Sequence, residues 1–196
     1  MPPSVRFPKE AVLDAACQLV RKSGADALNA RAIARELGGS TQPIFRIFMG
    51  MDDLRTELID YVADQFHRQA KQAMAGADAP YVQFCVAYLK FGRDEPELFK
   101  LLFMRSREGE ADFSNQTVYA PLFDIIREEM PLDADTLNRF FERTWLFVHG
   151  LAVCMATHYI PYQDDAYLTS MASEAYRAAL RMMNLPERNV EASHDE

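Results

Sequence analysis

The sequence has few of the residues and patterns that mark several large classes of protein. Its three cysteines lie far apart, and their odd number and spacing do not suit a zinc site or a disulfide framework. The most apolar stretch, residues 144–160, holds His149 and Gly150 and falls short of the roughly 20 apolar residues of a membrane-spanning helix. The first residues contain no apolar run of the secretory type. We therefore expect a cytoplasmic protein with reduced thiols and no membrane partner.

Catalytic signatures are missing as well. The sequence has no Gly-rich phosphate loop after a strand, no Gly-x-Ser-x-Gly and no His-Glu-x-x-His. The histidines of the apolar stretch, His149 and His158, are nine residues apart, which places them on opposite faces of a helix and argues against a shared metal. We therefore predict no catalytic residues, no metal and no cofactor. A helical-bundle enzyme is the least favoured alternative.

Helical spacing of apolar residues recurs along almost the whole chain, whereas no alternating run is long enough for a convincing strand. Pro8, Asn29, Ser40 and the pair Asp52–Asp53 are expected to begin helices, and Gly24 to end one. The fold class predicted is all-α with about nine helices. Their expected ranges are 8–24, 29–37, 40–48, 52–75, 81–93, 95–105, 116–129, 133–158 and 164–184.

Charge is distributed unevenly between the ends of the chain. Residues 1–50 hold seven Lys/Arg and four Asp/Glu, a balance of +3, which leaves 14 against 25 for the remainder and a total of -8. We predict a head over 1–52, a helical body over 53–185 and a flexible tail over 186–196. A basic head on an acidic body fits contact with DNA at one end. Ordinary fluctuation of charge is the alternative.

The segment from Gly38 to Phe48 has the layout of a helix-turn-helix, in which a glycine turn separates two short helices. Ile44 and Phe48 are expected to pack inward, and the first turn is expected to meet base edges or phosphates in the major groove. The other interpretation is a small helical hairpin with a capping serine and a solvated arginine. The DNA contacts predicted are Arg31, Ser40, Thr41, Gln42, Pro43, Phe45 and Arg46.

Residues 11–58 resemble the DNA-binding head of TetR-type transcriptional regulators. The resemblance rests on Val12-Leu13-Asp14-Ala15-Ala16, Gly24, Ile33-Ala34-Arg35-Glu36-Leu37-Gly38-Gly39-Ser40, Phe45-Arg46-Ile47-Phe48 and Asp52-Asp53-Leu54. Three positions depart from the family pattern: Phe45 stands where a Tyr is usual, Ile47 where a His is frequent and Met51 where a Lys is frequent. The resemblance implies a helix-turn-helix head on a helical body that binds a ligand and dimerises.

Residues 145–151 resemble a Trp-x-x-x-His-Gly segment in the penultimate long helix of some TetR-type bodies. The resemblance places dimerisation in the last two helices, and small side chains in the final one permit close helix approach. Packing of this stripe inside one subunit is the alternative. The interface residues predicted are Leu168, Met171, Ala172, Ala175, Ala179 and Met182.

Aromatic side chains of the body are candidates for lining a pocket for a small apolar or aromatic effector. Packing in the core is the alternative for each of them, and His149 is a candidate for orienting the effector. The pocket residues predicted are Tyr88, Phe99, Phe103, Tyr119, Phe123, Trp145 and His149.

These features together predict a homodimeric, ligand-responsive transcriptional repressor that leaves a palindromic double-stranded DNA operator when an effector binds. The second hypothesis is a helical small-molecule-binding protein with weakened or lost DNA binding. It is motivated by the absence of polar groups at Phe45, Ile47 and Met51.

Overall fold

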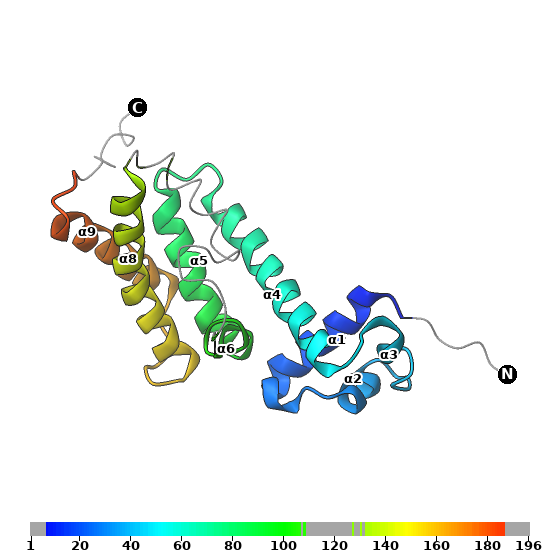
Figure 1. Cartoon of the computed structure of the whole chain (residues 1–196). Helices are drawn as coiled ribbons and strands as arrows, with labels where there is room; N and C mark the ends of the chain where they lie inside the picture. Colours follow the sequence, from blue (N-terminus) through cyan, green and yellow to red (C-terminus); the bar gives the residue numbers. More distant parts are fainter. Residues whose placement is uncertain (1–6, 107, 109–126, 128–129, 131, 187–196) are drawn as a thin grey trace. The chain divides into compact units, whose positions relative to one another are not determined.

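The computed structural model describes residues 7–106, 108, 127, 130 and 132–186. These residues form eight α-helices and a short 3₁₀ helix, with no strand among them, which confirms the all-α class (Figure 1). The helix expected over 116–129 lies almost wholly outside the described residues, as does the tail beyond Pro186. Over the described part of the chain, no helix is both long enough and apolar enough to cross a bilayer. The helices are α1 (Lys9–Ser23), α2 (Ala30–Glu36), α3 (Ile44–Ile47), α4 (Met51–Met74), α5 (Pro80–Asp94), α6 (Pro96–Phe103), α8 (Ala134–Ala156) and α9 (Asp165–Met182), with the 3₁₀ helix at Ala25–Ala27.

The chain divides into two compact units. The first comprises Met1–Phe66 and Glu95–Ser106, and the second comprises His67–Asp94 and Arg107–Glu196. The first unit reaches beyond the head predicted over 1–52, because it includes most of α4, up to Phe66, and all of α6. Helix α6 contacts α1, and an ion pair of 2.8 Å between Arg21 Nε and a Glu95 carboxylate oxygen joins the end of α1 to the start of α6. A pairing between residues so distant in sequence has no local signature.

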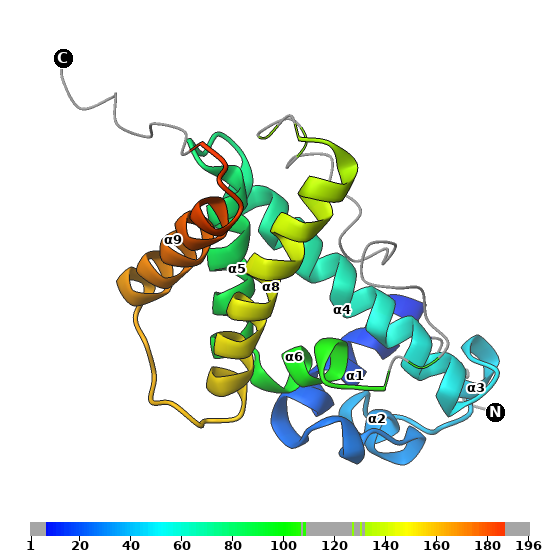
Figure 2. The same ribbon diagram turned by 60° about the vertical axis from the view of Figure 1, so that its left-hand side comes forward.

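In the first unit, α1 buries the face that its sequence predicts. Val12, Leu13, Ala16, Leu19 and Val20 are all buried. Gly24 ends the helix with a φ of 77°, a conformation that favours glycine, and its N–H donates to the carbonyl of Val20. Figure 2 shows α1, α2 and α3, in blue to cyan, gathered around the start of α4.

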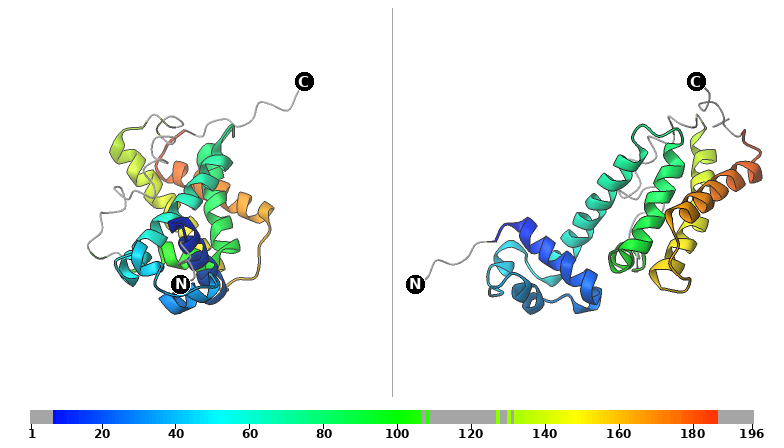
Figure 3. Two further views of the ribbon diagram at one scale, coloured as in Figure 1. Left: turned by 90° about the vertical axis from the view of Figure 1, so that its right-hand side faces the viewer. Right: turned by 180° about the vertical axis from the view of Figure 1, so that it is seen from behind.

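The second unit is built on α5, α8 and α9, each of which contacts the other two. Figure 3 shows α9 running obliquely across α8. The backbones of α5 and α8 approach closely at Gly92, where an added Cβ would lie 3.0 Å from the Cβ of Ala152. Tyr81 of α5 is buried at the centre of this unit, and its hydroxyl is hydrogen-bonded to that of Thr144 on α8.

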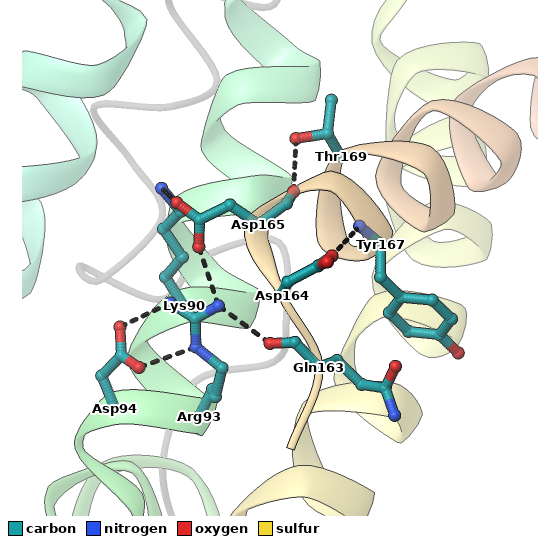
Figure 4. Close-up of polar contacts among 8 residues, drawn as sticks. All are labelled: Lys90, Arg93, Asp94, Gln163, Asp164, Asp165, Tyr167 and Thr169. Carbon is teal, nitrogen blue, oxygen red and sulfur yellow. Dashed lines mark hydrogen bonds and ion pairs between the residues drawn. The ribbon is translucent and has the colours of Figure 1, made fainter. Parts of the chain in front are cut away.

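An arginine on α5 fixes the entry of the chain into α9 (Figure 4). Arg93 donates to Asp165 at 2.7 Å, to the carbonyl of Gln163 at 3.0 Å and to both carboxylate oxygens of Asp94 at 2.7 and 2.9 Å. Lys90 forms a second ion pair with Asp165, and the two cations lower the pKa of that carboxyl group. The α9 N-terminus is therefore attached to α5 by charge-assisted hydrogen bonds, which are stronger than neutral ones.

Candidate nucleic-acid interface and effector site

Helix α2 is closed at both ends by hydrogen bonds that fix the turn after it. Asn29 caps it as predicted, with Oδ1 accepting from the N–H of Ala32 at 3.0 Å. At the other end, Gly38 N–H donates to the carbonyl of Arg35 and Gly39 N–H to that of Ala34, the two bonds of a Schellman motif. Gly38 has the positive φ, 64°, that this motif demands. The glycine pair therefore acts as a geometric stop that directs the chain toward α3.

The third helix is shorter than predicted and begins later. It covers Ile44–Ile47, its N-cap position is Pro43, and no side chain caps it. The prediction that Ser40 caps this helix is therefore wrong. The carbonyl of Thr41 instead accepts from the N–H groups of Ile44 and Phe45, at 3.1 and 3.3 Å, so a backbone turn supplies the start. Because Pro43 has no N–H, the turn leaves no donor there without a partner.

Two buried side chains anchor the short helix, as its spacing predicts. Ile44 is 1% exposed and Phe48 is 2% exposed. The predicted DNA-contact residues lie in the first unit, most of them on its surface: Arg31, Ser40, Gln42, Phe45 and Arg46 are exposed, whereas Thr41 and Pro43 are half-buried. The structure thus presents one continuous segment, residues 40–46, together with Arg31 in the first turn of α2.

The cations near this segment differ in what they contact. Lys9 pairs with Glu57 at 2.7 Å and lies over the ring of Phe48, and Lys22 pairs with Glu36 at 3.2 Å. These pairs are intramolecular and tie their lysines to other elements of the first unit. Arg31, an exposed cation in the first turn of α2, lies where a phosphate would also meet the helix N-terminus.

The predicted effector residues fall into two groups. Tyr88, Trp145 and His149 come together in the second unit: the Tyr88 hydroxyl is 2.8 Å from His149 Nδ1, and the indole stacks on the imidazole at 4.3 Å between centroids. Phe99 and Phe103 belong to the first unit, where their rings are 5.0 Å apart and Phe103 meets Phe66 edge-on. The remaining two residues, Tyr119 and Phe123, lie outside the described residues.

The Tyr88–His149–Trp145 cluster combines a buried hydroxyl with a half-buried imidazole and indole. Trp145 and His149 are four residues apart on α8, so they stand one turn apart on the same face. The Tyr88 hydroxyl and His149 Nδ1 share one hydrogen bond, and the tautomer of the imidazole sets which of them donates. The cluster therefore offers an aromatic surface beside a hydrogen-bonded imidazole.

The sequence did not reveal a second polar contact of this unit, the buried hydrogen bond between the hydroxyl groups of Tyr81 and Thr144. Thr144 is buried, and its hydroxyl lies 3.0 Å from the carbonyls of Phe140 and Phe141 while it also meets Tyr81. A single hydroxyl at a core position of an apolar helix was the available signal, since a buried hydroxyl requires a partner. The Arg93 attachment was missed for another reason, because its partners are 70 and 72 residues away.

The stripe predicted for the dimer interface is largely covered by its own chain. Leu168, Ala172, Ala175 and Ala179 are buried in the single subunit. They pack where α9 meets α5 and α8, so they have little surface left for a second subunit. Met171 is half-buried and Met182 is exposed.

Comparisons with known proteins agree with this architecture. Residues 81–184 match the family model described as "Tetracyclin repressor-like, C-terminal domain". Among solved structures, a protein from Vibrio parahaemolyticus described as a TetR-family transcriptional regulator aligns over 88% of this chain and 96% of its own, with 21% identity and a TM-score of 0.58. Another described in the same terms, from Mesorhizobium loti MAFF303099, aligns over 89% and 95%, with 14% identity and a TM-score of 0.52. No curated protein matches the sequence.

Proposed function

The chain belongs to the TetR family of transcriptional regulators, and from that premise we propose that it is a cytoplasmic, homodimeric repressor that leaves a palindromic operator when a small molecule binds. The observation that carries the proposal is the exposed segment 40–46, which follows a closed turn and is anchored by Ile44 and Phe48. A short rigid element of this kind fits the major groove. Two copies would enter successive grooves about 34–36 Å apart.

The dimer proposed here uses the exposed apolar side chains of α8 and α9. Leu146 and Phe147 are 59% and 46% exposed on α8, and Met182 is exposed on α9. Met171, half-buried on α9, is retained from the predicted set. Large exposed apolar side chains on two helices that contact each other support a two-fold interface in which each subunit covers those of its partner.

The effector is proposed to contact Tyr88, Trp145 and His149. A planar apolar or aromatic molecule suits an indole surface stacked on an imidazole ring. Binding releases DNA only to the extent that the effector prefers the conformation whose heads no longer match the operator.

Selection of random duplexes by the purified full-length chain tests DNA binding. We expect a palindrome to be enriched at low salt, and the double substitution Gln42→Ala and Arg46→Ala to abolish enrichment while the dimer persists in sedimentation. The matched control, Arg68→Ala with Gln72→Ala, removes the same side chains from an exposed part of α4 and should retain enrichment. Enrichment that survives loss of Gln42 and Arg46 would show that another element reads DNA.

The same selection decides the second candidate function, a helical ligand-binding protein that no longer binds DNA. It is favoured by the apolar residues Phe45, Ile47 and Met51, which stand where the family resemblance expects polar phosphate contacts. If no duplex is enriched at low salt while small molecules still bind, this second function replaces the repressor.

Effector binding is testable with the chain's own fluorophore, since Trp145 is the single tryptophan. We expect aromatic compounds that release the selected duplex to change its emission, and Tyr88→Phe and His149→Leu each to weaken their binding. A compound that releases DNA with equal affinity for both variants would place the effector elsewhere.

A further inference from the structure

Two large apolar side chains stand exposed at the proposed DNA surface. Phe45 is 51% exposed and Met49, just beyond the end of α3, is 95% exposed. The anchoring of α3 is already supplied by Ile44 and Phe48, so neither exposed side chain is needed to hold the helix. Exposed apolar groups on a binding surface favour contact with an apolar partner.

The backbone fixes where these side chains lie. Phe45 N–H donates to the carbonyl of Thr41, and Phe48 N–H donates to that of Ile44, so residues 44–47 form one helical turn that ends at Phe48, where the backbone becomes extended. Phe45 directly follows Ile44 on this turn, about 100° farther round the helix axis, and it is exposed whereas Ile44 is buried. The N–H of Met49 donates to Asp53 Oδ2 at 2.8 Å, which attaches this residue to the first turn of α4.

In the major groove, the C5-methyl group of thymine is the one apolar feature that a base edge presents. Phe45 and Met49 carry no N–H or O–H in their side chains, so they cannot donate to a phosphate. Resting on the proposed DNA-binding function, we infer that Phe45 and Met49 read the methyl groups of thymines in each operator half-site. The polar readers Gln42 and Arg46 lie in the same segment, so methyl contact and hydrogen-bonded readout are combined.

This mode of recognition has a distinct dependence on salt. Contact with a methyl group releases no counter-ions, whereas each phosphate neutralised by a cation steepens the fall of affinity with salt. Contact of Phe45 and Met49 with methyl groups therefore contributes selectivity that persists as salt is raised. Cations such as Arg31 and Arg46 supply the salt-dependent part.

The test asks whether one protein side chain contacts one methyl group of the DNA. In the duplex enriched by the full-length protein, each thymine is replaced in turn by deoxyuridine, which removes only the methyl. Loss of one buried methyl corresponds to about fourfold in affinity, and symmetric loss in both half-sites to about 15-fold. We expect Phe45→Ala to bind the thymine and uracil duplexes equally at one position, and Met49→Ala to do so at a neighbouring position.

Two further variants test whether the thymine preference depends on the aromatic ring of Phe45. Phe45→Tyr keeps the ring and should keep the thymine preference. Met104→Ala, which truncates another exposed side chain of the first unit, should also keep it. A thymine-to-uracil ratio that is the same in wild type and in both alanine variants would overturn the inference and leave DNA binding intact. Failure to enrich any duplex would overturn the proposed function, and this inference with it.

Discussion

Replacement of Gly92 by alanine tests how tightly α5 and α8 pack. The new Cβ would lie 3.0 Å from the Cβ of Ala152, 3.2 Å from its carbonyl oxygen and 3.3 Å from its Cα. Carbon atoms in favourable contact are about 3.5–4.0 Å apart, so the two helices would have to separate by several tenths of an ångström. Two of the three opposing atoms are backbone, which cannot rotate away as a side chain can.

Two effects oppose each other in this substitution. Alanine inside a helix is favoured over glycine by about 0.5–1 kcal/mol. Overpacking of a filled core costs about 1–3 kcal/mol. Because the clash involves backbone, we expect the second effect to exceed the first. Gly92→Ala should then lower the free energy of unfolding by about 1–2 kcal/mol.

Urea denaturation followed by circular dichroism at one protein concentration measures the change. Ala152→Gly is the matched second variant, because it removes the atom nearest to the new methyl group. The double variant should be more stable than the sum of the single effects by about 1 kcal/mol, and rescue stays partial because the backbone contacts remain. If Gly92→Ala alone stabilises the protein, as helix propensity demands, the close approach of α5 and α8 is not a constraint.

Three further predictions concern the caps, the buried thiol and the dimer. Asn29→Ala should lower the stability of the first unit by about 1 kcal/mol in urea denaturation, since the N–H of Ala32 loses its acceptor. Burial raises the pKa of Cys17 from 9.0 to about 11. Above pH 9 the unfolded thiol releases its proton before the folded one, so stability should fall between pH 9 and 11. A Cys17→Ala variant with an equally steep fall would contradict this assignment. Phe147→Glu should shift the sedimenting species from dimer to monomer, and an unchanged dimer would place the interface away from α8.

The sequence predicted most of the local architecture of the first unit. The end of α1 at Gly24, the Asn29 cap and the buried faces of α1 and α3 all agree with the structure. Each of these depends on residues within a few positions of one another, so a local pattern is sufficient. Ser40 was wrongly predicted to cap α3. A serine before a helix looks the same in sequence whether its side chain or a backbone carbonyl accepts from the first N–H groups of the helix.

Contacts between distant residues were decided by the tertiary structure alone. The sequence offered seven effector candidates of one chemical type, and only the fold placed Tyr88 with Trp145 and His149 and assigned Phe99 and Phe103 to the other unit. The fold also buries Ala172, Ala175 and Ala179 of α9 within their own subunit.

By itself, the sequence determined the all-α class, most helix limits and the exposed segment with its glycine turn. These follow from periodicity, capping and backbone sterics, which act over a few residues. The tertiary structure decided which amphipathic faces cover one another, the attachment of α9 to α5 through Arg93 and the close approach at Gly92. Such choices depend on the packing of whole helices. An apolar stripe shows that one face of a helix must be buried, but it does not show which element buries that face.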